Sequence, residues 1–176
     1  MAVLRADSAE EWAHVISESL VPLSMANTCA TFRGSVEQTV LLPGLAVTDV
    51  RTQGRSTVLR TPRLTRSEPC DDYLFSLHLG GAGVGLQDER EAVLRPGTGA
   101  LLDASRPYQL SFPADSWEIV LQIPRQPLRD RVADIDELSG RALPADHPAE
   151  RVLAAFLREP AGVSQELTPE QRAELG

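Results

Sequence analysis

The 176-residue sequence contains no lysine, and all 17 of its basic side chains are arginines. A Walker-type phosphate loop requires a lysine that reaches the phosphates, and Schiff-base chemistry on a carbonyl or on pyridoxal phosphate requires a lysine amine. Both kinds of chemistry are therefore excluded for these residues. A GC-rich codon bias explains the missing lysines more simply than selection for a particular function does.

Cysteines, aromatic residues and long apolar runs are also scarce. The two cysteines, Cys29 and Cys70, form no CxxC pair, which argues against a zinc site or a disulfide framework. With two Trp, two Tyr and four Phe, the core has to be built mostly from Leu, Val and Ala. No apolar run approaches ~18 residues, and the N-terminus does not resemble a signal peptide. We expect a soluble, cytoplasmic protein that does not contact a membrane.

Negative charge is concentrated at the two ends of the chain. The formal net charge is −8, of which residues 1–20 contribute −3, residues 21–129 contribute zero and residues 130–176 contribute −5. Proteins that bind DNA through counterion release present an excess of positive charge to the phosphates. We therefore expect no nucleic-acid contact by this chain alone.

A helix is expected before Pro22, and short strands are expected from about residue 27 to residue 124. Ser8 and Glu11 have the spacing of a capping box at the start of the helix. Its apolar face consists of Trp12, Val15, Ile16 and Leu20. Period-two alternation predicts the clearest strands at 73–79, 108–112 and 117–123. Further strands are expected at 28–33, 36–41, 45–51, 56–60, 84–87 and 91–94, the last two joined by a hairpin turn at Asp88-Glu89-Arg90.

These strands follow one another without an intervening helical pattern, which is typical of a β-sandwich or barrel. The helical period returns after Pro124, where four apolar residues share one face before Gly140: Leu128, Val132, Ile135 and Leu138. Further helices are expected to begin near Asp146 and at Thr168. The last of them would be only about two turns long at Gly176, so we expect the chain to be a fragment of a longer protein.

No catalytic or metal-binding constellation is evident. Residues 80–85 are rich in glycine but do not fit GxGxxG and are expected to form a β-turn. His78 is the only histidine in the strand region, and it falls on the polar side of its strand, opposite Phe75 and Leu77, where a surface position or a position between elements is expected. A metal site needs three or four converging ligands, and no GxSxG motif supplies a nucleophile. We therefore expect no metal, no cofactor and no enzymatic activity.

Two polar features allow a structural and a functional interpretation. Five arginines form a basic stripe that is expected to face solvent, with an anion or partner contact as the alternative: Arg51, Arg55, Arg60, Arg63 and Arg66. In the turn 103–108, Asp103 is expected to accept turn amides and to pair with Arg106. The alternative is a direct ligand contact by Tyr108 or by Arg106, the latter to an anion.

The order and spacing of six segments resemble one protein family. The segments are Arg60-Thr61-Pro62, Tyr73 to Leu79, Gln87-Asp88, Leu94-Arg95-Pro96-Gly97, Asp103 to Tyr108, and Ile123-Pro124-Arg125. Together they resemble the N-terminal cupin-like ligand-binding domain of AraC-type bacterial transcriptional regulators. The resemblance extends from about Trp12 to Arg129 and more loosely through the C-terminal helices.

The resemblance implies a mainly β fold with flanking helices, namely a cupin-like β-barrel or jelly roll preceded by one helix and followed by C-terminal helices. Residues 1–126 would form the effector-binding domain, and residues 127–176 a helical dimerisation or linker segment. A helix-turn-helix DNA-binding domain would follow outside this chain. Enzymatic cupins carry an HxH motif and a later histidine, whereas this chain has only His78 and then Tyr108, so their metal site is not carried over.

We therefore expect the effector-sensing and dimerisation part of an AraC-type regulator, acting as a homodimer that binds a small-molecule effector. Side chains expected to line the pocket, chosen by alternation alone, are Phe75, Leu77, Tyr108, Trp117, Ile119 and Leu121. Plain core packing is the alternative explanation for all six. Two other functions stay open, a small cupin enzyme (isomerase or dioxygenase) and a structural dimerisation module without a ligand. The identity of the effector, its sign of action and the controlled promoter are not encoded in these patterns.

Overall fold

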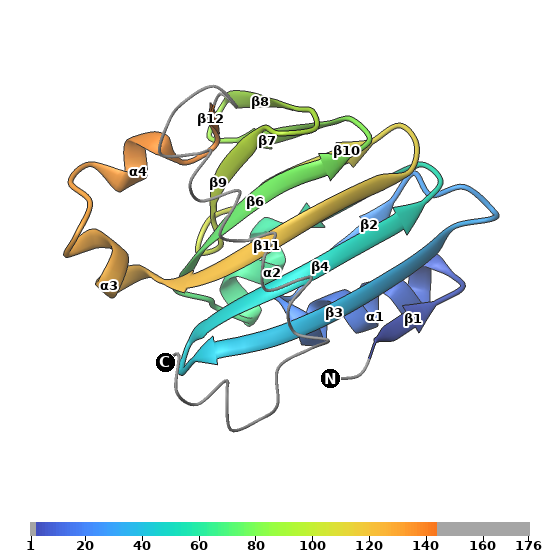
Figure 1. Cartoon of the computed structure of the whole chain (residues 1–176), viewed down its shortest axis with the longest axis horizontal. Helices are drawn as coiled ribbons and strands as arrows, with labels where there is room; N and C mark the ends of the chain where they lie inside the picture. The colour runs from blue at the N-terminus through green and yellow to red at the C-terminus, as the bar shows by residue number, and fades with distance from the viewer. Residues whose placement is uncertain (1–2, 144–176) are drawn as a thin grey trace.

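The segments that alternate between apolar and polar residues pair into two antiparallel sheets (Figure 1). The computed structural model describes residues 3–143. Within them, the seven-stranded large sheet has the spatial order β1 (Leu4–Ala6), β3 (Arg33–Leu42), β4 (Leu45–Gln53), β11 (Ser116–Pro124), β6 (Asp72–Gly80), β9 (Gly99–Asp103) and β12 (Ala142–Leu143). The five-stranded small sheet has the order β2 (Ser24–Ala26), β5 (Ser56–Arg60), β10 (Tyr108–Phe112), β7 (Gly83–Gln87) and β8 (Arg90–Leu94).

The mainly β prediction is confirmed, and of the two forms expected, a β-barrel or a jelly roll, the strands do not close into a barrel. Over residues 3–143 the strands divide into two separate sheets, and no hydrogen-bonded pairing joins one to the other. The helices of this part of the chain are α1 (Ala9–Ser19), α2 (Pro62–Ser67), α3 (Arg125–Arg129) and α4 (Ile135–Leu138). Figure 1 shows α1 behind the β1–β3 edge of the large sheet, with α3 and α4 beyond the end of β11.

The predicted N-terminal helix is confirmed as α1. Ser8 is its N-cap, and the Ser8 hydroxyl accepts a hydrogen bond from the backbone N–H of Glu11 at 3.1 Å. The Glu11 carboxylate in turn accepts the backbone N–H of Asp7 at 2.9 Å, which completes a reciprocal cap. Trp12 and Ile16, from the predicted apolar face, are 1% and 3% exposed, so packing against the sheets holds this short helix in place.

The apolar residues form two clusters rather than one. The inner cluster lies between the sheets and takes side chains from both of them, including Val50, Leu74, Leu110, Phe112 and Val120. The outer cluster takes its strand residues from the large sheet alone and is covered by the segment that carries α3 and α4. Its buried members are Val47, Tyr73, Phe75, Leu77, Leu101, Ile119, Leu121 and Ile135. The central strands of the large sheet are therefore buried on both faces.

Gly34 in β3 allows the Trp12 ring to pack against the backbone of the large sheet. A Cβ at this position would lie 2.3 Å from the nearest ring carbon of Trp12. We expect Gly34→Ala to lower the free energy of unfolding by about 1–3 kcal/mol, because the buried ring has to move. Gly80→Ala is the matched control, since its Cβ would meet Trp117 at an ordinary 3.5 Å. Chemical denaturation of both variants checks the prediction, and equal losses would contradict it.

Most predicted strands are confirmed, and the differences have local causes. Asp88 and Glu89 adopt φ values of 50° and 61°, as a two-residue hairpin turn requires, and join β7 to β8 as expected. The strand expected at 28–33 is wrong, because β3 begins only at Arg33. The single helix expected from Leu128 to Leu138 is divided into α3 and α4, with Asp134 in the left-handed region between them. The helices expected near Asp146 and Thr168 lie outside the described residues.

Candidate functional site

A cavity of about 40 Å³ lies between the two sheets and is closed on one side by α1. Most of its wall is apolar. The lining residues are Trp12, Ile16, Leu20, Leu23, Val50, Thr52, Val58, Leu74, Ser76, Leu102, Tyr108, Leu110, Phe112, Glu118 and Val120. A space of this size accommodates about one water molecule, so a larger occupant requires movement of the wall.

Four polar side chains interrupt this apolar wall, and three of them have a hydrogen-bond partner. Thr52 bonds to Ser116 on the neighbouring strand at 2.8 Å, hydroxyl to hydroxyl. Ser76 in β6 donates its hydroxyl proton to Oε2 of Glu118 in β11. The fourth, Tyr108, has a hydroxyl that makes no hydrogen bond with any residue of the described part of the chain. The cavity therefore contains a carboxylate and an unpaired hydroxyl.

Tyr108 is held in the inner cluster at the start of β10 and is 5% exposed. Burial raises the pKa of the Tyr108 hydroxyl well above its ordinary value of 10.0, and the nearby Arg60 charge only partly opposes this effect. The phenol is therefore neutral at physiological pH, and it offers the cavity both a hydrogen-bond donor and an acceptor.

His78 is buried between the two sheets, which fits the inter-element option and not the surface option of its expected position. It is 0% exposed, and its ring meets Phe112 edge-on with 5.6 Å between centroids. Both ring nitrogens are buried without a hydrogen-bond partner in the described residues. His78 is on the side of β6 opposite Phe75 and Leu77, as predicted, but that side faces the inside of the molecule.

The same reversal places most predicted lining residues away from the inter-sheet cavity. Of the six, only Tyr108 lines it. Four belong to the outer cluster: Phe75, Leu77, Ile119 and Leu121. Trp117 shares their face of β11, where its indole N–H donates to Asp49 at 3.2 Å and its ring lies 4.3 Å from the Arg51 guanidinium. Alternation identified residues that share a face but assigned that face to the wrong side of the large sheet. Their role in ligand binding stays a prediction.

Arg125, the first residue of α3, is the buried centre of an ionic network that reaches the surface at Asp71 and Asp136. It is 8% exposed, and its guanidinium lies 4.5 Å from the centre of the Tyr73 ring. It donates hydrogen bonds to Asp71 and Asp103, to the Tyr73 hydroxyl at 3.0 Å and to Asp136 at 3.4 Å. We call Arg125, Asp71, Tyr73, Asp103 and Asp136 the Arg125 network. It connects β6 and β9 to both short helices.

The turn after β9 has the hydrogen bonds expected for a scaffold. Asp103 accepts the backbone N–H of Ser105 at 2.9 Å and the Arg106 guanidinium at 2.9 Å. Arg106 also pairs with Asp88 in the β7–β8 turn, so two carboxylates already hold it. Anion binding by Arg106 stays a prediction. Gln87 accepts the backbone N–H of Asp103 at 2.9 Å and the hydroxyl of Ser139, which ties this turn to the segment that follows α4.

Asp103 makes the stability of the fold sensitive to acid. Burial by itself raises the pKa of Asp103, but the hydrogen bonds from Arg125 and Ser105 outweigh burial and lower that pKa below its ordinary value of 3.8. The ionised form therefore stabilises the fold above about pH 4, and this contribution is lost as the pH falls through the depressed pKa. We expect the melting temperature of the wild type to fall more steeply below pH 4 than that of Asp103→Asn. Parallel slopes in the two thermal titrations would contradict this assignment.

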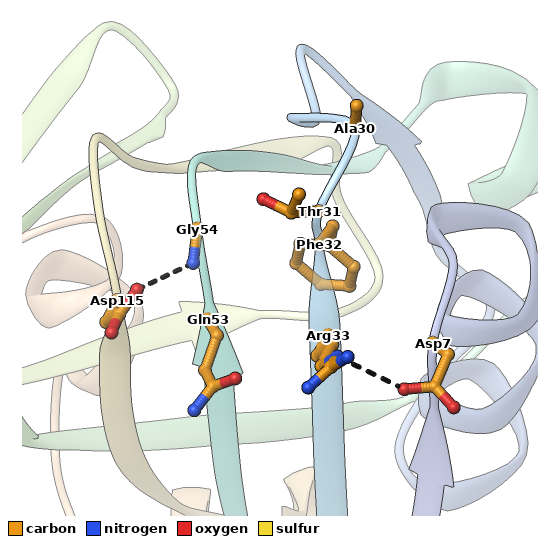
Figure 2. A pocket seen from close by; sticks show the side chains of 8 residues that line it. All are labelled: Asp7, Ala30, Thr31, Phe32, Arg33, Gln53, Gly54 and Asp115. Carbon is orange, nitrogen blue, oxygen red and sulfur yellow. Dashed lines mark hydrogen bonds and ion pairs between the residues drawn. The ribbon is translucent and has the colours of Figure 1, made fainter.

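A second hollow, of about 650 Å³, is an open groove at one end of the large sheet (Figure 2). Each of its charged side chains has a partner on a neighbouring segment. Arg33 lies 3.4 Å from Asp7, and Asp115 accepts the backbone N–H of Gly54 at 2.7 Å. Figure 2 shows the two pairs on opposite sides of the groove, each joining neighbouring segments. The charged side chains of the groove are therefore already engaged by the fold.

Neither a metal cluster nor a membrane-spanning helix is found in the part of the chain that the structure describes. Within residues 3–143 no three His, Cys, Asp or Glu side chains are grouped as metal ligands. None of the helices there has the length and apolar character needed to cross a bilayer. The inter-sheet cavity, whose apolar wall carries the Glu118 carboxyl group and the Tyr108 hydroxyl, is the best-supported candidate site on geometric grounds.

Comparison with known proteins finds one family model and several relatives that match most or part of the chain. Residues 12–175 match the family model described as AraC-binding-like domain. The chain is 32% identical, over 149 residues, to a protein of Bacillus sp. (strain OxB-1) described as an uncharacterised protein in the nit 5′ region. It is 34% identical over 76 residues to the transcriptional activator NphR of Rhodococcus sp., which covers 43% of this chain and 23% of that activator.

A solved structure has a similar fold. The crystal structure of the AraC-like transcriptional activator CuxR superimposes with a TM-score of 0.80, covers 98% of this chain and is 16% identical to it. At this level of identity the comparison bears on the fold alone. The match to the Bacillus protein covers 84% of this chain and 57% of that protein. The match to CuxR covers 65% of the CuxR chain. The chain therefore spans less than two thirds of either of these proteins.

Proposed function

The chain belongs to the family of AraC-binding-like domains, and from this we propose that it is the effector-sensing part of an AraC-type transcriptional regulator. DNA binding would be the task of a helix-turn-helix domain outside this chain, which agrees with the net charge of −8. The proposal includes a cupin-like jelly-roll core in residues 1–126, a helical dimerisation or linker segment in residues 127–176 and a homodimer in the cytoplasm. It assigns no catalytic activity to the chain.

One observation carries the proposal, namely the apolar cavity between the sheets into which Tyr108 and Glu118 bring polar groups. Ligand sites in proteins are concave and mostly apolar, and a few placed polar groups fix the ligand's orientation. The cavity of about 40 Å³ is smaller than an ordinary effector site. An effector therefore has to displace part of the wall, and that displacement is the signal that a regulator requires.

The strands β6 and β11 offer a route from this cavity to the helices. Leu74 faces the cavity, whereas its neighbour Tyr73 belongs to the Arg125 network on the other face of β6. In β11, Glu118 and Val120 line the cavity, and the strand leads directly into α3 at Arg125. A shift of either strand would therefore move residues that hold α3 and α4. We propose that the segment after β11 responds to the effector by this route.

Thermal unfolding of the chain against a library of small metabolites tests the proposal. We expect at least one compound to raise the melting temperature at saturation, by mass action on the folded state. Val58→Met fills the cavity and should abolish the shift, whereas Leu77→Met, on the outer face, should preserve it because the side-chain volume is nearly unchanged. If the whole library left the melting temperature unchanged, the sensing function would be refuted in favour of a structural dimerisation module. Loss of the shift in Leu77→Met alone would instead locate the effector on the outer face.

A further inference from the structure

We propose that the effector is a small amphiphilic amine whose protonated head pairs with Glu118 in the inter-sheet cavity. This inference rests on the sensing function proposed above and specifies the chemistry of that same site. The cavity wall contains one carboxyl group, that of Glu118, surrounded by apolar and aromatic side chains. Asp103, the other buried acid of the described residues, is paired with two arginines.

Glu118 is a buried acid without a cationic partner. The residue is 6% exposed, and its carboxylate accepts one hydrogen bond, from Ser76. Among residues 3–143 no Arg or His nitrogen lies within 4.0 Å of it. Removing a carboxylate from water without a compensating charge costs several kcal/mol. The Glu118 carboxyl group therefore lacks a compensating cation at a position that faces the candidate site.

Asp103 is a buried acid with a structural role, and it has cationic partners. Its side chain is 3% exposed, and it is paired with both Arg125 and Arg106. It also accepts the backbone N–H and the hydroxyl of Ser105. Glu118 lacks any such cation, although it is buried to a similar degree. We therefore assign the role of its cationic partner to a bound ligand.

The basic groups nearest to the cavity do not fill this role. Arg60 acts electrostatically on Tyr108, but its guanidinium donates to three backbone carbonyls. His78 is the direct cross-strand neighbour of Glu118. Its ring packs against Phe112, and neither of its nitrogens has a partner in the described chain. A cation brought by the ligand is the simplest way to satisfy the carboxylate.

The rest of the wall defines the body of the ligand. Trp12 and Phe112 supply aromatic surface, and aromatic faces attract cations as well as apolar groups. The free Tyr108 hydroxyl provides a second polar contact. Leu20 and Leu23 are only partly buried, so they form the part of the wall that yields most easily to a larger occupant. A compact aliphatic or aromatic amine meets all these conditions.

The test keeps the body of the probe constant and changes its head. Benzylamine, benzyl alcohol and benzoate, and the matching isobutyl series, are titrated calorimetrically into the full chain and into two variants. Glu118→Gln keeps the shape of the side chain and an acceptor for Ser76. Glu91→Gln, at an exposed acid in β8, is the matched control. We expect an amine to bind the wild type at least about tenfold more tightly than its alcohol, as for a desolvated charge pair. Glu118→Gln should abolish that preference, and Glu91→Gln should retain it.

Stability in the absence of any probe gives an independent readout. We expect Glu118→Gln to melt at or above the wild-type temperature, because it replaces a buried carboxyl group that has no cationic partner among residues 3–143. A clear loss of stability would identify Glu118 as a structural residue and overturn the inference. Tighter binding of benzoate or of the alcohols, or no binding of either amine, would also overturn it. The sensing function is judged separately, by the library response and its sensitivity to Val58→Met.

Discussion

Replacement of Arg125 by methionine is expected to lower the free energy of unfolding by about 3–5 kcal/mol, the cost of breaking a buried ion pair from one side. The guanidinium is the shared partner of Asp71 and Asp103, and it also holds the Tyr73 hydroxyl. Methionine keeps most of the apolar contact with the Tyr73 ring but leaves the Asp103 carboxylate, 3% exposed, without its main countercharge. Equilibrium denaturation measures the loss.

Arg129→Met is the control for this prediction. Arg129 pairs with Asp136 from a side chain that is 44% exposed, so its removal should cost at most about 1 kcal/mol. The double variant Arg125→Met with Asp103→Asn should lose less stability than the sum of the two single variants, because each single change leaves a buried group unpaired. Additive losses, or equal losses for Arg125 and Arg129, would contradict the central position of Arg125 in the network.

The positions of most of the longer strands were predictable because local chemistry marks them, whereas the short strands β1, β2 and β12 were not predicted. The β7–β8 hairpin follows from Asp88-Glu89, and β10 has the predicted bounds, 108–112. The α1 cap follows from Ser8 and Glu11 for the same reason. These features depend on neighbours in the sequence, so alternation and turn propensity are sufficient to find them.

The direction in which each face points was not predictable from alternation. The large sheet is buried on both faces, so β6 carries apolar residues outward at Phe75 and Leu77 and a mixed set inward at Leu74, Ser76 and His78. A simple polar-out rule then assigns the inward face to solvent. Glu118 lies on the polar side of β11 by the same alternation and lines the cavity, so nothing in the sequence pattern alone marks it as a site residue. Placing these residues needed the pairing of β11 with β4 and β6.

Arg60 shows a second limit of sequence reasoning. The sequence pattern predicts that Arg60 faces solvent together with four neighbouring arginines. Arg60 is in fact 1% exposed, whereas Arg63 and Arg66 lie on the surface. Its partners are backbone carbonyls, which every residue possesses and which leave no mark in the sequence. Only the tertiary fold, in which α2 and the turn after β9 converge on the end of β5, reveals why this arginine is internal.

We expect Arg60→Met to lower the free energy of unfolding by at least about 3 kcal/mol, since three buried acceptors lose their donor together. The Arg60 guanidinium donates to the carbonyls of Ala104 at 3.0 Å, Pro22 at 2.8 Å and Glu68 at 2.7 Å. These carbonyls belong to three segments that no strand pairing joins to one another. Methionine fills much of the volume but satisfies none of the three, so the loss reports the hydrogen bonds rather than a cavity.

Arg63→Met separates this effect from a general loss of positive charge. Arg63 lies one turn away at the start of α2 and is exposed, so its replacement should change stability by no more than about 0.5 kcal/mol. Hydrogen exchange locates the damage in Arg60→Met. The amides of α2 and of the turn 103–108 should lose protection before those of β3 and β4, because the guanidinium joins the former directly. Uniform loss of protection across both sheets would show instead that Arg60 supports the core as a whole.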